Sequence, residues 1–435
     1  MPVPRGPQRP AATVWLPWLV VAATIATIAV GLTAKFAFDA HWGAPAQPLI
    51  LFLRPALSTW AIPGLALLGA ALLAAPRLLR ARIGSFGFGV ALFAMTLVSR
   101  VALNVARGGP GDLSQVFSLS GGEGRTEYLP GLAYLQHAGV GGLLERWVGL
   151  IPGLPTHLAG HPPGLLLSMD ALGLDSAAGL AALTIGVGAL ATPVLYLLAR
   201  ELSDEITARV AALLFVFVPT SLLYGATSAD ALYATLGVTA AALLLVAGPL
   251  RRALGAVALA LASFFSYALL AAGAWAAIVR WRRDGFAAAL RMALLCGAAL
   301  AVFYLGLYLL TGFDLFAAIR ATDARYREGL AAHRPYFFYL FGSPAAFLVM
   351  LGPVAWFAAR ALVERESAAL GLAAVIAISV LAGYTKAETE RIWLFLVPFA
   401  CLAAARSLAV KRLPLVLTAL GFQAIATEIL FVTKW

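Results

Sequence analysis

Charge is scarce in this sequence. Only 12% of its 435 residues are charged, and the 20 acidic residues are outnumbered by 31 Lys and Arg. Hydrophobic residues make up 62% of the chain and the mean hydropathy is +0.90, which excludes an ordinary soluble domain. Apolar runs of about 20 residues, the length of helix that crosses ~30 Å of hydrocarbon, recur along the chain. The sequence therefore predicts an all-α, polytopic membrane protein.

Cysteine is also rare. Cys296 and Cys401 both lie in apolar runs, which excludes a disulfide framework and a thiolate metal site. The net charge of +11 comes from Arg in short clusters between apolar runs, a pattern that reflects membrane topology rather than binding of nucleic acid. The N-terminal MPVPRGPQRP is a basic tail with no small-residue cleavage site after the next apolar run, so we expect an uncleaved first span.

Most of the apolar runs have the length of one span. We predict spans near 14–34, 58–75, 86–105, 177–199, 209–224, 229–247, 289–311, 342–360, 367–384, 392–408 and 413–432. The run 254–279 is too long for one span and too short for two, and its FFSY centre predicts a hairpin of two short helices. The expected total is about 11–13 transmembrane helices.

Basic clusters predict the orientation. With the N-terminus in the cytoplasm and 254–279 as a hairpin, every Arg and Lys cluster between spans falls on the cytoplasmic side of the plasma membrane. Most acidic residues then share the extracytoplasmic face with all five histidines: His41, His137, His157, His161 and His333. The sequence predicts five parts: N-terminal helices (1–105), an extracytoplasmic catalytic loop (106–176), central helices (177–311), a second extracytoplasmic loop (312–341) and C-terminal helices (342–435).

The first long loop contains short helices and three candidate bases. YLPGLAYLQ and VGGLLERWVGLI have apolar residues at helical spacing, which predicts amphipathic helices on the membrane surface. HPPGLLLSMDALG predicts a further short helix, with Pro162 and Pro163 opening its first turn. A general base must stay ionised and reach an acceptor hydroxyl, and Asp112, Glu123 and Glu127 are the acids that could do so. Alternatively, all three are ordinary solvated loop acids.

Asp230 begins the span that follows VPTSLLYGATSAD. It either caps the helix, with Ser228 nearby, or faces the loop carboxylates and His161. In the second case His161 and Asp230 are the residues that would hold a divalent cation, although their spacing is not diagnostic of a metal site.

A second polar group lies at the outer edge of a later span, in GYTKAETERIWLF. Lys386, Glu390 and Arg391 could bind phosphate there, with Arg391 as the bidentate donor and Glu390 or Glu388 orienting it. The alternative is an interfacial anchor that ends at Trp393. Further cations expected on this face, either for phosphate or for lipid headgroups, are Arg125, Arg320, Arg325, Arg327 and Arg334.

The order of these features resembles the GT-C membrane glycosyltransferases, and in particular the bacterial relatives of protein O-mannosyltransferases and aminoarabinose transferases. The likeness covers about residues 106–247 and rests on TEYLPGLAY, on His161 with its proline pair, and on Asp230. The resemblance implies Glu127 as the catalytic base and Tyr128, His161 and Asp230 as substrate-binding residues. This chain departs from the family in having three spans before the loop and no Asp-Glu pair.

The resemblance also implies the reaction. A GT-C enzyme moves a sugar from a polyprenyl phosphate to an acceptor with inversion, here a mannosyl or arabinosyl type of transfer to a cell-envelope glycan, glycolipid or protein. One alternative is an envelope lipid transporter or flippase, although the chain has no internal repeat and few ionisable groups within spans. The other alternative is a non-catalytic protein of envelope assembly.

Overall fold

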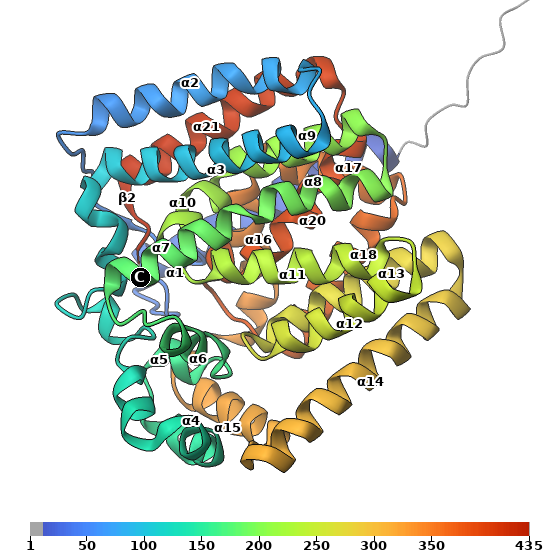
Figure 1. Ribbon diagram of the computed structural model, residues 1–435. Helices are drawn as coiled ribbons and strands as arrows, with labels where there is room; N and C mark the ends of the chain where they lie inside the picture. The colour runs from blue at the N-terminus through green and yellow to red at the C-terminus, as the bar shows by residue number, and fades with distance from the viewer. Residues whose placement is uncertain (1–11, 435) are drawn as a thin grey trace, which may run out of the picture.

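The computed structural model describes residues 12–434, and helices make up most of this part of the chain (Figure 1). The predicted basic tail, residues 1–10, lies outside the described residues. The helices are α1 (Ala12–Phe38), α2 (Ala61–Arg80), α3 (Ser85–Gly108), α4 (Gly131–Leu150), α5 (Thr156–Ala159), α6 (Gly164–Ala171), α7 (Ala177–Ala189), α8 (Ala191–Leu202), α9 (Glu205–Phe217), α10 (Pro219–Thr227), α11 (Asp230–Leu245), α12 (Pro249–Ser263), α13 (Leu270–Asp284), α14 (Phe286–Thr311), α15 (Leu315–Glu328), α16 (Tyr336–Leu351), α17 (Pro353–Val363), α18 (Ser367–Ala382), α19 (Thr389–Ile392), α20 (Val397–Ser407) and α21 (Leu413–Leu430).

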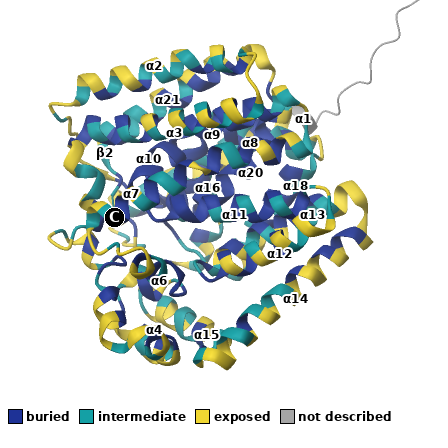
Figure 2. Cartoon of the chain, in the orientation of Figure 1, coloured by how far each residue is buried: buried dark blue, intermediate teal, exposed yellow. Residues whose placement is uncertain are grey.

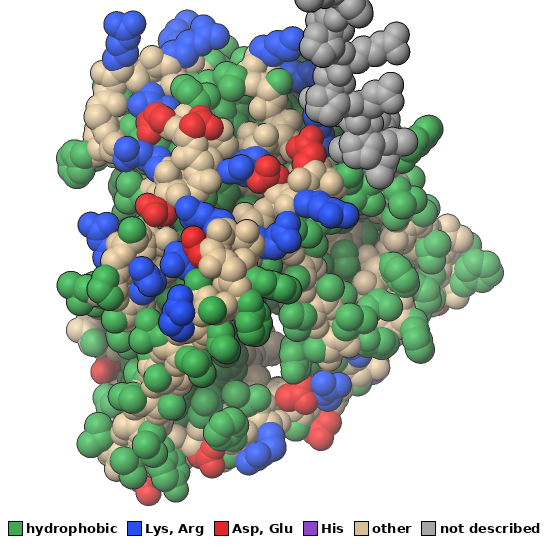
Figure 3. All heavy atoms as spheres, turned by 90° about the vertical axis from the view of Figure 1, so that its right-hand side faces the viewer, with side chains coloured by type: hydrophobic (Ala, Val, Ile, Leu, Met, Phe, Trp, Pro, Cys, Tyr) green, Lys and Arg blue, Asp and Glu red, His purple; other side chains and the backbone are tan. Residues whose placement is uncertain are grey.

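The helices confirm a polytopic helical membrane protein. Six described helices are long and apolar enough to cross a membrane, or eight if each of two bent pairs is one span. This number is below the predicted 11–13, because several expected spans are shorter helices, among them α11 and α18 with 16 residues each. On the face in Figure 3, hydrophobic side chains cover a broad area and charged side chains gather mainly in its upper part, as expected for a surface that contacts lipid.

Two predicted spans are broken. The span expected at 209–224 is α9 followed by α10, bent by 56°, and the span at 342–360 is α16 followed by α17, bent by 113°. Pro219 and Pro353 each open the second helix of a pair, since proline cannot donate the hydrogen bond that would continue the first. The expected hairpin at 254–279 is confirmed as α12 and α13, separated by residues 264–269.

The core lies along the middle helices. Figure 2 shows α10, α11, α16 and α20 largely buried, whereas α2 and α14 carry long exposed stretches. Residues 208–217 of α9 and 397–405 of α20 are all buried. Helices that are apolar all round are expected inside a bundle, where other helices surround them. The α14 helix packs on α12 and α13 at the rim of the molecule (Figure 1).

The first long loop folds into short helices beside α15 (Figure 1). Most of both predicted amphipathic segments, 128–136 and 140–151, lies in α4, which is kinked where Gly139 adopts a φ of 68°. The helix α6 begins at Gly164, directly after the proline pair. The loop is therefore helical at these positions, whereas the amphipathic character of its helices and their place on the membrane surface stay predictions.

The last described segment of the chain forms a short β-strand. The span expected at 413–432 ends at Leu430, and β2 (Phe431–Val432) then pairs antiparallel with β1 (Phe52–Leu53). Arg107 stabilises this junction by donating to the carbonyl oxygens of Ile429 (3.2 Å) and Arg54 (2.8 Å). The fold is therefore helical with one small two-stranded sheet in the described chain.

Candidate functional site

A cavity of about 640 Å³ gathers most of the predicted site residues. Its walls come from the first long loop, the start of α11, the end of α15 and the segment 384–392. Six predicted residues line it: Glu127, Tyr128, His161, Asp230, Lys386 and Arg391. The sequence therefore identified both the loop and the span edges that form this site.

Glu127 is buried on one wall of the cavity. Its Oε1 atom lies 3.8 Å from Nε2 of His157. The backbone N–H of His157 donates to the Thr126 carbonyl oxygen (2.9 Å). This bond holds α5 against the segment that carries Glu127. Burial raises the pKa of Glu127 to about 8, and the nearby Arg391 opposes this shift. A carboxyl group with that pKa can accept a proton near neutral pH.

His157 and His161 are both neutral near pH 7. Burial lowers the pKa of His161 to about 4 and holds the pKa of His157 well below its usual value, and the positive charge of Arg391 lowers both further. His157 was not singled out among the five histidines, and the structure places it beside Glu127.

An aromatic group lies next to these residues. The hydroxyls of Tyr128 and Tyr233 are 2.6 Å apart, and the His161 ring lies 5.1 Å from that of Tyr233. Tyr233 was not predicted, although its position three residues after Asp230 places both on one face of α11. The loop with His161 is held by Gly164, whose N–H donates to the Phe264 carbonyl oxygen (3.0 Å).

Asp230 faces the cavity rather than capping its helix. The Ser228 hydroxyl donates to Asp230 Oδ2 (2.6 Å) and accepts the Asp230 N–H (3.1 Å), so Ser228 occupies the capping role. The Asp230 carboxylate lies 3.7 Å from Nε of Arg391. The capping interpretation of Asp230 is therefore wrong.

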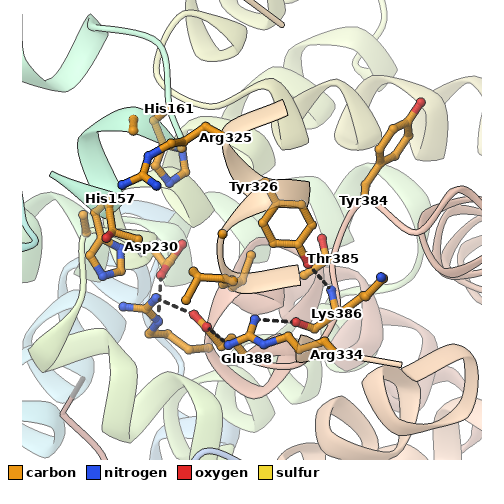
Figure 4. Close-up of a pocket in the computed structure, with 18 of the residues that line it drawn as sticks. His157, His161, Asp230, Arg325, Tyr326, Arg334, Tyr384, Thr385, Lys386 and Glu388 are labelled. Atoms are coloured by element: carbon orange, nitrogen blue, oxygen red, sulfur yellow. Dashed lines mark hydrogen bonds and ion pairs between the residues drawn. The ribbon is translucent and has the colours of Figure 1, made fainter. Parts of the chain in front are cut away.

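Another part of the lining is cationic, and Figure 4 shows Glu388 beside Arg334 there. Glu388 accepts from Nη2 of Arg334 (2.5 Å) and from Nη2 of Arg391 (3.3 Å). Arg334 also donates to the Lys386 carbonyl oxygen (2.6 Å), and the Lys386 N–H donates to the Tyr326 hydroxyl (2.7 Å). Together with Arg325 on α15, these side chains form a wall suited to a phosphate group.

The interfacial-anchor interpretation of this segment is wrong. Arg391 and Trp393 are 3% and 2% exposed, so neither reaches the headgroups. Ala387 and Glu388, shortly before Arg391, adopt the left-handed backbone conformation, with φ angles of 62° and 63°. Such a conformation costs a non-glycine residue about 1 kcal/mol and recurs at functional sites.

Three predicted residues lie away from the cavity lining. Asp112 forms an ion pair with Lys434 at the end of the chain. Glu123 is exposed in a short 3-10 helix (Glu123–Arg125). Glu390 is fully buried behind the cavity, where it accepts the Ile50 N–H (2.7 Å). One helical turn places residues 388 and 391 on the same face, so residue 390 points elsewhere.

Metal ligands do not cluster in this site. Among residues 12–434 no group of three or more His, Cys, Asp and Glu side chains is arranged to hold a metal ion. His161 and Asp230 both line the cavity, and the divalent cation expected between them stays a prediction.

Comparison with known proteins adds no assignment. No protein-family model matches the chain, and no curated protein matches it significantly.

Proposed function

We propose that the protein is an inverting GT-C-type glycosyltransferase that moves a sugar from a polyprenyl-phosphate donor to a cell-envelope glycan, glycolipid or protein on the extracytoplasmic face of the plasma membrane. One observation carries the proposal. A single cavity is lined both by Glu127, a buried carboxyl group with a raised pKa, and by the cations Arg334, Lys386 and Arg391. The transfer reaction needs both groups, a base for the acceptor and cations for the leaving phosphate.

The reaction is a single displacement. The acceptor hydroxyl attacks the anomeric carbon and gives its proton to Glu127, while the bond from that carbon to the phosphate oxygen breaks. The electron pair of this bond leaves with the polyprenyl phosphate, and attack from the opposite side inverts the anomeric configuration. A base whose pKa lies near the working pH combines a useful ionised fraction with a strong driving force for proton transfer.

The leaving phosphate gains negative charge as the bond breaks. Arg334 and Arg391 present planar guanidinium groups that can donate two hydrogen bonds each, and Lys386 supplies a third cation. Asp230 holds Arg391 through their ion pair. Fixed donors of this kind stabilise the developing charge without having to reorganise during the reaction.

The sugar is placed beside Glu127, where aromatic side chains line the cavity. Tyr128, Tyr233 and His161 line the cavity beside Glu127 and offer ring faces and hydroxyls to a hexose or pentose.

The test is a transfer assay on the purified protein in lipid nanodiscs. Radiolabelled polyprenyl phosphates carrying mannose, arabinose, glucose or galactose are supplied with extracted envelope glycan as acceptor. We expect transfer of one of these sugars by the wild type and its loss in Glu127→Gln, with Glu123→Gln as the matched control. Translocation of the intact lipid without any transfer would support the flippase alternative.

A further inference from the structure

Glu388 occupies the place where a phosphate would meet both arginines. Its Oε1 atom accepts from Arg334 (2.5 Å) and its Oε2 atom accepts from Arg391 (3.3 Å), so one carboxylate bridges the two guanidinium groups (Figure 4). A carboxylate and a phosphate oxygen pair bind arginine with the same bidentate geometry. An entering phosphate and Glu388 therefore compete for the same donors.

Asp230 and Glu388 both contact Arg391, and the Glu388 side chain is the less constrained of the two. Asp230 is held by the Ser228 hydroxyl and lies in the first turn of α11. Glu388 lies on a loop, directly after Ala387, and both residues have left-handed φ angles. The arginine contacts help to hold the Glu388 side chain in its observed position, so losing them permits it to adopt another rotamer.

The segment around Glu388 is tied to the protein at its two sides. Before it, Lys386 is held through its backbone N–H and carbonyl by Tyr326 and Arg334. After it, the N–H groups of Arg391 and Ile392 donate to the Glu388 carbonyl oxygen (3.0 and 2.8 Å). These contacts fix the backbone on either side, and the Glu388 side chain is free to rotate away without unfolding α19.

We propose that Glu388 is an internal competitor that fills the phosphate subsite of the ligand-free protein and is displaced when the phosphate of a polyprenyl phosphate enters. The inference rests on the proposed function, since it concerns the phosphate of the same donor. Only the fraction of molecules with Glu388 displaced binds phosphate, so the apparent affinity is reduced by that fraction. The same competition helps to expel the polyprenyl phosphate left after transfer, a dianion that two arginines would otherwise retain.

The test measures binding of undecaprenyl phosphate to the purified full-length protein in nanodiscs. Glu388→Gln removes the competing charge, and the dissociation constant should fall by about fivefold or more. Glu388→Asp keeps the charge but shortens its reach and should give a smaller fall. Glu328→Gln is the matched control, because Glu328 lines the same cavity with the same charge. The dissociation constant of Glu328→Gln should stay within about twofold of the wild-type value.

Arg334→Gln separates the competitor role of Glu388 from the proposed function. It should raise the dissociation constant by about tenfold. If Glu388→Gln weakens binding or leaves it unchanged while Arg334→Gln weakens it, Glu388 orients the arginines and the competitor role is overturned, with the proposed function intact. If neither wild type nor Glu388→Gln binds undecaprenyl phosphate, the proposed function fails together with the inference. Thermal melting of each variant confirms that it is folded.

Discussion

Glu127 and His157 lie within 3.8 Å of each other, measured from Oε1 to Nε2, in a cavity that Arg334 and Arg391 also line. The histidine is neutral and the carboxyl group has a pKa raised to about 8, because both are buried. A neutral imidazole can donate to the ionised carboxylate and keep it oriented toward an acceptor. The pair is the chemical centre of the proposed transfer reaction.

Glu127→Gln should abolish most of the transfer activity. The amide cannot accept the acceptor's proton, and loss of a general base typically lowers kcat by about 10²–10⁴-fold. Gln has the same shape, so the thermal melting temperature should be close to that of the wild type. Initial rates of sugar transfer measure the effect. Glu123→Gln, at the exposed acid of the same loop, should retain the wild-type rate, and equal loss in both variants would contradict the assignment.

The pH profile should show one ascending limb. Glu127 acts only when ionised, and burial raises its pKa to about 8, so kcat/KM should rise about tenfold per pH unit below that value and level off above it. The pKa of His161, lowered to about 4 by burial, places its titration outside this range. Rates measured from pH 6 to 9 check the limb. A wild-type profile that is flat across this interval is inconsistent with Glu127 as the base.

His161→Ala should lower transfer by about tenfold without unfolding the protein, because a sugar loses one contact in the cavity. His137→Ala is the control, since His137 is exposed on α4. Transfer rates and melting temperatures are compared for the two variants. An unchanged rate in His161→Ala would show that the segment His161–Pro163 has a purely structural role.

Gly43→Ala should weaken donor binding. Gly43 has a φ of 73°, and a Cβ atom there would lie 2.9 Å from Cγ of Arg334. The substitution strains the backbone by about 1 kcal/mol and moves the arginine, so KM for the donor should rise several-fold. Gly69→Ala is the control, because a Cβ at Gly69 meets nothing within 4 Å. An unchanged KM in Gly43→Ala would show that Arg334 does not contact the donor.

Glu390 should matter for stability rather than for catalysis. Glu390→Ala leaves the buried Ile50 N–H without its acceptor, which costs about 1–3 kcal/mol in unfolding free energy. Glu390→Gln keeps an oxygen in place and should cost less. Chemical denaturation in detergent compares the two. If Glu390→Gln instead lowers kcat/KM strongly at unchanged stability, Glu390 contacts the substrate after all.

Much of the helical architecture could be predicted from the sequence. The summed hydrophobicity of about 20 consecutive residues determines whether a helix enters lipid, and this sum can be taken from the sequence alone. The breaks were harder to place. Pro219 and Pro353 could each have opened, kinked or ended a helix, and the sharp bends at these positions are set by the helices packed around them. The 254–279 hairpin was predicted correctly, because its length alone excluded both a single span and two standard spans.

The site was predicted in part. Glu127 and Arg391 were chosen for their residue types and for the loops that carry them, and both line the cavity. Asp112 has the same chemistry and the same loop, and only its ion pair with Lys434, 322 positions later, removes it from the site. His157 was underestimated because nothing in its local sequence shows that it contacts Glu127.

By itself, the sequence determined that this chain is a helical membrane protein with its ionisable residues concentrated in a few segments. Burying charge in lipid is costly, so composition alone restricts where chemistry can occur. Only the tertiary structure decided which of those residues meet. Arg334 and Glu388 are 54 positions apart, and their contact depends on how α15, α16 and the segment before α19 pack together. Such packing depends on the shapes of many side chains at once, which no local pattern encodes.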